Sequence, residues 1–171
     1  SLCLLLGFLR ERSLETAFGS ETLEAQKSPK RTYMDMEKPE WLSQMGNVLE
    51  ALNEGVIIAD DSNHILFANS VFVEMTGMSR EDLIGIKSSR FYSCEEWRYL
   101  SEQIEIAIRV GHNRYGFVLP RKDGSRLPVI ISSRRIEDLN GRKYGVATFT
   151  DISEQKRAED QLHSRLWEFQ K

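Results

Sequence analysis

The sequence predicts an α+β domain with a flanking helix at each end, and three observations support this. Residues 55–60 and 64–68 are short apolar runs around the turn-forming residues 61–63 (DSN), as in a hairpin. Three later β-branched runs are joined through Asp-Gly at 123–124 and Asn-Gly at 140–141, dipeptides that tolerate positive φ. Helix-capping patterns lie between the two groups. The predicted order is therefore two strands, several helices and three strands.

The composition limits the class of protein. The chain has 171 residues, 40% hydrophobic and 29% charged, which suits one globular domain with flanking helices. Its net charge of −3 argues against a nucleic-acid partner, because nucleic-acid binding normally needs a basic face. Cys3 and Cys94 lie far apart with no Cys-x-x-Cys pair, which fits a reducing compartment. We therefore expect a cytoplasmic domain.

Residues 1–38 are predicted to be an apolar segment followed by a linker. Residues 2–9 (LCLLLGFL) are apolar and precede Arg10 and Arg12, but eight residues cannot span a bilayer. They fit either the end of a truncated transmembrane helix, which would tether the domain to a membrane, or a short buried helix. Residues 18–38 are polar and lack sustained periodicity, as a linker does.

Residues 39–53 form a predicted flanking helix that Pro39 opens. One stripe of this helix is apolar, which means that it needs a surface to cover, either the sheet of its own domain or a partner chain. The stripe consists of Trp41, Met45, Val48 and Leu52.

Capping patterns predict the helices between the strands. Asn69 and Ser79 are placed to begin two short helices. Ser93 and Glu96 form a capping-box pattern that opens a longer helix to about Val110.

Three strands then complete the domain, over residues 115–119, 126–136 and 143–150. Because side chains alternate along a strand, one apolar set should share the face of the sheet that meets the helices. This set consists of Phe117, Leu119, Val129, Ile131, Ala147 and Phe149. The opposite face also carries apolar residues, Val118, Ile130, Tyr144 and Val146, so it too should be covered.

The last strand is followed by a charged helix with no flexible linker between them. Asp151 is placed to cap that helix while Glu154, three residues on, reaches back to the cap. A shift of the last strand should therefore move the helix. We expect Asp151, Ile152, Ser153 and Glu154 to couple the domain to whatever the helix contacts.

Four segments together resemble a PAS domain with its PAC segment: ALNEGVIIADDSNHILFAN, MTGMSREDLIG, RKDGSRLPV and GVATFTDISEQKRAEDQL. The resemblance implies a five-stranded antiparallel sheet with helices on one face and a small cavity, over residues 54–151, and then a C-terminal signalling helix over residues 152–171. It also implies sensing and dimerisation without catalysis, upstream of a histidine kinase, a diguanylate cyclase or a transcription regulator. Residues 151–153 (DIS) are similar to the family's Asp-Ile-Thr junction.

Eleven apolar residues are candidates to line such a cavity. They fill a densely packed core or surround a small apolar ligand, and dense packing of protein interiors favours the first interpretation. The candidates are Ile57, Ile65, Phe67, Phe72, Ile104, Ile108, Phe117, Leu119, Val129, Ile131 and Phe149.

The sequence predicts no cofactor, and it argues against flavin, haem and metal. Light-oxygen-voltage flavin domains resemble residues 89–92 but have a reactive Cys where this chain has Ser89, and a Gln where it has Phe149. Haem-binding PAS domains supply a His from the long helix, which here has none; His112 follows that helix as a loop residue or a displaced ligand. No histidine has metal-ligand spacing.

The exit helix carries Leu162 and Leu166 on a heptad-like seam, which favours a parallel homodimer over a solvated single helix. We therefore predict a sensory and dimerising module that signals through this helix to an effector domain in the same polypeptide. The alternatives are a ligand-free dimerisation scaffold and a small enzyme acting in the cavity. The enzyme lacks any acid-base pair pointing inward, so no catalytic residue is predicted.

Overall fold

The computed structural model describes residues 38–168, without the side chains of Ser164, Leu166, Trp167 and Glu168. The predicted apolar segment with its membrane tether, and nearly all of the linker, lie outside the described residues. Between residues 38 and 168, no helix is both long enough and apolar enough to cross a membrane.

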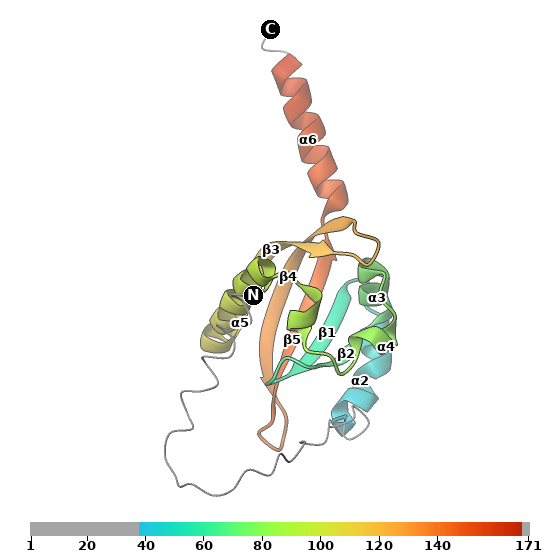
Figure 1. The fold of residues 1–171 in the computed structure, drawn as a ribbon, viewed down its shortest axis with the longest axis vertical. Coiled ribbons are helices and arrows are strands. Elements are labelled where there is room, and N and C mark those ends of the chain that lie inside the picture. The colour runs from blue at the N-terminus through green and yellow to red at the C-terminus, as the bar shows by residue number, and fades with distance from the viewer. Residues whose placement is uncertain (1–37, 169–171) are drawn as a thin grey trace, which may run out of the picture. The chain divides into compact units, whose positions relative to one another are not determined.

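Five strands form one antiparallel sheet, as predicted, and within it they lie in the order β2-β1-β5-β4-β3 (Figure 1). The strands are β1 (Gly55–Asp60), β2 (Ile65–Ala68), β3 (His112–Pro120), β4 (Arg126–Glu137) and β5 (Lys143–Asp151). The helices are α2 (Glu40–Glu50), α3 (Ser70–Thr76), α4 (Arg80–Leu83), the 3₁₀ helix η3 (Ser88–Phe91), α5 (Cys94–Val110) and α6 (Ser153–Glu168). Pairing of β1 with β5, far apart in the chain, makes the sheet continuous.

The hairpin turns and the cap of α5 have the predicted residues. Gly124 and Gly141 have φ of +82° and +76° in the two later hairpins, where a residue with a side chain would be strained. Asn63 takes the same left-handed region in the first hairpin, with φ of 62°. The Ser93 and Glu96 capping box is formed at the start of α5.

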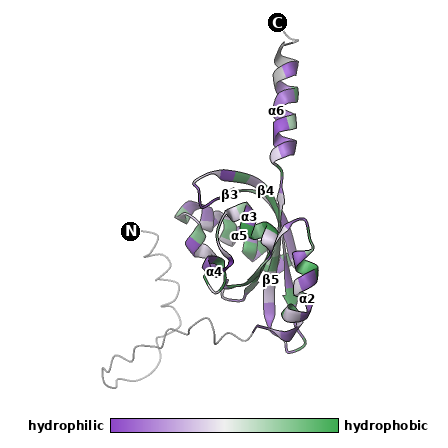
Figure 2. Cartoon of the chain, turned by 90° about the vertical axis from the view of Figure 1, so that its right-hand side faces the viewer, coloured by the Kyte–Doolittle hydropathy of each residue, from purple (hydrophilic) through white to green (hydrophobic). Residues whose placement is uncertain are grey.

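Helices α3, α4 and α5 lie on one side of the sheet and α2 lies on the other (Figure 2). The first side holds the main core, whose fully buried members are Ile65, Ala68, Phe72, Leu83, Leu100, Leu119, Val129, Ile131 and Phe149. The predicted inner face is therefore confirmed, including Phe117 and Ala147, which pack against this core.

Helix α2 covers part of the second face, as the apolar residues there suggested. Trp41 meets Tyr144 edge-on, with ring centroids 5.4 Å apart, and Leu42 is buried. The predicted stripe is only partly covered: Met45 is 45% exposed and Val48 55% exposed. Leu52, 42% exposed, lies beyond the end of α2, which stops at Glu50 and not near Asn53 as predicted.

Strand β3 begins three residues earlier than predicted. His112, Asn113 and Arg114 have no apolar pattern, yet they pair with Arg134, Ser133 and Ser132 of β4. A strand is held by backbone hydrogen bonds to its neighbour, so a long neighbouring strand such as β4 can extend β3 through polar residues. The periodicity of apolar residues cannot identify such an extension. His112 is therefore an exposed strand residue and not the loop residue that was predicted.

The junction between β5 and α6 differs in detail from the prediction. One residue, Ile152, separates them, so the absence of a linker is confirmed. Asp151, however, is the last residue of β5, and its Oδ1 accepts a hydrogen bond from the Ser153 amide at 2.8 Å. No hydrogen bond of the Glu154 side chain is present within residues 38–168, so the predicted capping box is wrong. The helix starts one residue later than a cap at Asp151 requires.

Candidate functional site

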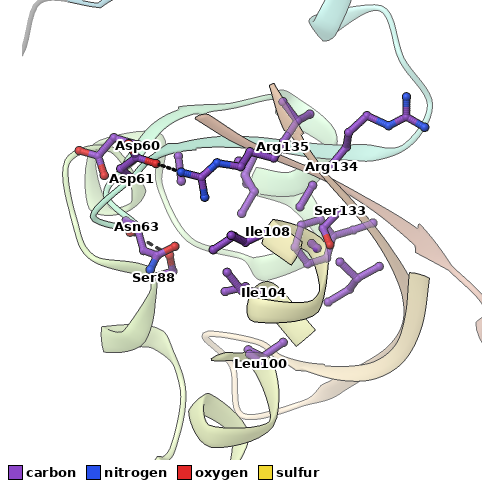
Figure 3. Close-up of a pocket in the computed structure, with 18 of the residues that line it drawn as sticks. Asp60, Asp61, Asn63, Ser88, Leu100, Ile104, Ile108, Ser133, Arg134 and Arg135 are labelled. Atoms are coloured by element: carbon purple, nitrogen blue, oxygen red, sulfur yellow. Dashed lines mark hydrogen bonds and ion pairs between the residues drawn. The ribbon is translucent and has the colours of Figure 1, made fainter. Parts of the chain in front are cut away.

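A pocket of about 130 Å³ lies between α5 and the inner face of the sheet (Figure 3). Leu100, Ile104 and Ile108 reach it from successive turns of α5, because residues three or four apart share one side of a helix. Ile131 of β4 and Phe149 of β5 line it from the sheet. The remaining apolar lining residues are Ile57, Ala59, Trp97, Ala107, Tyr115, Val146 and Ala147.

Charged residues surround one end of this first pocket. Arg135 of β4 forms an ion pair with Asp61 in the turn between β1 and β2, and the pair is drawn as a dashed line in Figure 3. Ser88 Oγ donates to the Asn63 carbonyl at 2.9 Å and ties η3 to the same turn. Arg134 lines the pocket but points away from the other labelled side chains (Figure 3). The first hairpin is thus held to both β4 and η3 at the end of the pocket.

Four hydroxyl groups border the same pocket, those of Ser88, Tyr92, Tyr115 and Ser133. Ser133 Oγ is buried and has no hydrogen-bond partner within the described residues. Burial raises the pKa of the Tyr92 phenol, and the nearby Tyr115 phenol raises it further. Burial also raises the pKa of Tyr115. Both phenols therefore stay protonated at neutral pH, and away from its charged end the pocket is largely apolar, with neutral hydroxyl groups at its wall.

The predicted cavity residues divide between two pockets. The first pocket takes Ile57, Ile104, Ile108, Ile131 and Phe149. A second pocket, on the other side of Tyr92, takes Phe72 and Leu119. Tyr92 lines both. Ile65, Val129 and Phe117 border neither pocket; the first two are buried in the core and Phe117 packs against it.

Phe67 was expected in the cavity, and its placement there is wrong. A register shift between Ile58 and Ala59 breaks the alternation along the first hairpin, so that Phe67 pairs with Ile58. Cross-strand partners share a face, and Ile58 lies on the face opposite Ile57. Phe67 belongs neither to the core cluster nor to either pocket. A β-bulge of this kind leaves no periodic signal in the sequence.

Several lining residues were not among the predicted ones, above all Tyr92, Ser133, Asp61 and Arg135. Ser133 could have been identified from the sequence as a polar residue at an inward-facing position, because it lies two residues after Ile131 in β4 and so points to the same face of the sheet. No sequence signal indicates that Asp61 pairs with Arg135, which lies 74 residues away.

The residues predicted for coupling and dimerisation are not brought into the pocket. Asp151 and Glu154 are exposed, whereas Ile152 and Ser153 are partly buried. The side chain of Leu166 lies outside the described residues, and Leu162 is 61% exposed. Within residues 38–168, no group of three His, Cys, Asp or Glu side chains could hold a metal ion.

Comparison with known proteins relates this geometry to a family. A family model described as a PAS domain matches residues 53–154. A curated relative, the methyl sulfide methyltransferase-associated sensor of Methanosarcina acetivorans, is 26% identical over 113 residues, which are 66% of this chain and 11% of that protein. The chain thus spans about a tenth of the length of that relative.

Solved PAS domains have the same fold. A PAS domain from a two-component sensor histidine kinase aligns with a TM-score of 0.55 and 15% identity, over 65% of this chain and 96% of that one. The PAS domain of a LuxR-family transcriptional regulator from Burkholderia thailandensis, solved in complex with ethanol, aligns with a TM-score of 0.55 and 22% identity, over 63% and 96%. Since the family model matches more than half of its residues, the chain belongs to the PAS domain family.

Proposed function

We propose that this PAS domain is a non-catalytic sensory module in which a small molecule in the first pocket biases the junction between β5 and α6. The observation that carries the proposal is the position of Phe149, which lines the pocket two residues before β5 ends. Only Ile152 separates that end from α6, so movement of β5 has no flexible segment to absorb it.

Contacts at the junction support transmission of such a movement. The Ile152 amide donates to the Pro128 carbonyl of β4 at 3.1 Å, which fixes the chain as it leaves the sheet. Thr150 Oγ1 donates to Glu54 Oε1 at 2.6 Å and holds the end of β5 against the start of β1. A change in β5 therefore reaches the first turn of α6 through short, directed bonds.

The dimensions of the pocket favour a small neutral occupant. Its volume, about 130 Å³, lies below the roughly 300–1,000 Å³ of typical ligand pockets and resembles the roughly 150 Å³ cavity that accommodates benzene in an engineered protein. A flavin or haem does not fit such a volume, and neither His nor Cys lines it. We infer that the occupant is a compact apolar molecule and not one of these cofactors.

We further propose that the domain works as a parallel homodimer in the cytoplasm and passes its signal to an effector domain in the same polypeptide. Exposed apolar side chains on and beside two flanking helices, Met45, Val48, Leu52 and Leu162, support a partner surface, because helices with such residues bury them against one another.

Filling the pocket tests the relay. Ile108→Trp adds bulk at the pocket, whereas Val110→Trp adds the same ring two residues on, at a position that does not line it. We expect the first variant alone to change hydrogen exchange of the amides at residues 152–156 and the output of the full-length protein. Equal exchange and output in both variants and in the wild type would refute the relay.

A ligand-free dimerisation scaffold is the second candidate, and the exposed apolar residues on and beside α2 favour it. Thermal-shift measurements with a broad set of small apolar molecules separate the two functions. A melting temperature that no molecule changes, together with a dimer that Val48→Glu dissociates, would favour the scaffold.

A further inference from the structure

A second pocket lies between the short helices and the end of β3, separated from the first by Tyr92. Its volume is about 280 Å³, close to the lower limit of roughly 300 Å³ for ligand pockets. The walls come from α3, α4, η3 and the β3–β4 turn, and are largely apolar. The apolar lining residues are Phe72, Met78, Leu83, Phe91, Leu119 and Pro120.

The same pocket is lined by three basic residues, Arg90, Arg121 and Lys122, and by no acidic one. Lys122 has a partner nearby, since its Nζ lies 3.4 Å from Asp82 Oδ2, but both side chains are more than half exposed. An exposed pair of this kind is weak. Lys122 therefore leaves most of the positive potential of the pocket in place.

Neither arginine forms an ion pair within residues 38–168, although the Arg121 guanidinium interacts electrostatically with the exposed Asp123 carboxylate. One terminal nitrogen of Arg121 donates to the Glu74 carbonyl at 3.3 Å, which positions the guanidinium without neutralising it. Its Nε is buried and has no hydrogen-bond partner among the described residues. Arg90 is exposed and forms no ion pair there. A buried guanidinium N–H without an acceptor is costly, and a carboxylate supplies the acceptor that guanidinium geometry matches best.

We propose that this second pocket binds a small amphipathic carboxylate, with its ring or chain among the apolar residues and its carboxylate at Arg121 and Arg90. The class follows from the combination of an apolar floor, basic residues on the wall and a volume too small for a nucleotide. The site is distinct from the first pocket, with which it shares only Tyr92.

Three probes with one skeleton and different head groups test the proposal: 3-phenylpropionate, 3-phenylpropan-1-ol and 3-phenylpropylamine. Calorimetry on the full chain should give an affinity for the carboxylate at least about tenfold above that for the alcohol, and no measurable binding of the amine. The advantage of the carboxylate should shrink as salt is added.

Variants locate the site. Arg121→Gln and Arg90→Gln should each remove most of the preference for the carboxylate, and Arg90 is the more informative position because its side chain is exposed and forms no ion pair within residues 38–168. Arg114→Gln, an exposed arginine of β3 away from the pocket, should leave binding unchanged. Ile108→Trp, which obstructs the first pocket, should also leave binding of the carboxylate unchanged. Failure of this proposal can therefore be told apart from failure of the relay.

Three results would overturn the proposal. The first is equal affinity for the carboxylate and the alcohol, and the second is full binding of the carboxylate by both Arg90→Gln and Arg121→Gln. The third is loss of binding in Ile108→Trp, because the probe would then occupy the first pocket.

Discussion

Asn69 joins three elements of the domain, and its replacement gives the most quantitative prediction. The side chain is completely buried. Its Oδ1 accepts from the Val56 amide at 2.8 Å and from the Phe72 amide at 3.0 Å, and its Nδ2 donates to the carbonyls of Leu49 and Glu54 at 3.1 and 2.9 Å. This one side chain thus satisfies backbone hydrogen-bonding groups of β1, α3, the end of α2 and the segment between α2 and β1.

The expected cost of Asn69→Ala is the sum of two effects. Loss of the cap on α3 costs about 1 kcal/mol. The buried Val56 amide and the two carbonyls lose their partners, which adds about 2–4 kcal/mol. The total of about 3–5 kcal/mol is a large part of the roughly 5–15 kcal/mol that stabilises a typical domain, and at about 4 °C per kcal/mol it lowers the melting temperature by about 12–20 °C.

Urea unfolding followed by circular dichroism measures this loss, and Asn53→Ala is the matched control. Asn53 is exposed, so the control should change the free energy of unfolding by no more than about 0.5 kcal/mol. Asn69→Asp should retain the two accepted bonds but lose both donated ones, and should destabilise the protein at neutral pH. A loss below about 1 kcal/mol in Asn69→Ala would refute the assignment of this side chain as a structural junction.

Three further predictions concern single contacts. Asp151→Ala should remove the bond to the Ser153 amide, at a cost of about 1 kcal/mol, and reduce coupling between pocket and α6; unchanged output of the full-length protein would contradict it. Gly55→Ala should destabilise by about 1–3 kcal/mol, because its Cβ would lie 2.8 Å from the Met75 sulfur and also 3.3 Å from the Phe72 Cα, a backbone atom of α3 that cannot move aside as a side chain can. A thermal melt equal to wild type would disprove this. Glu96 accepts a hydrogen bond from the Ser93 amide, and this bond, with help from Arg126, holds the pKa of the Glu96 carboxyl below the ordinary 4.5. The stability that ionised Glu96 contributes to the fold is therefore present above pH 4.5 and is lost as pH falls through the lowered pKa. Glu96→Gln should therefore lose less stability than wild type between about pH 6 and pH 3 in urea titrations, and parallel losses would contradict this.

The local signals in the sequence were sufficient for the elements and for the family. The Asp-Gly and Asn-Gly dipeptides at residues 123–124 and 140–141 indicate hairpins locally, because the glycine of each supplies the positive φ that the turn needs. The box at Ser93 and Glu96 is equally local, since both partners lie within one helical turn. Alternation then assigned Val129, Ile131 and Phe149 to the buried face.

Tertiary structure decided the features that depend on residues far apart in the chain. The bulge that turns Phe67 away from the core, and the extension of β3 through His112, arise from pairing with another strand. Tyr92 divides the interior into two pockets, and Asp61 meets Arg135 only because the sheet brings the first hairpin beside β4. The sequence by itself determined which segments are strands and helices, since caps and turns act over a few residues. The shape and polarity of the sites depend on packing across the whole sheet, which no short pattern encodes.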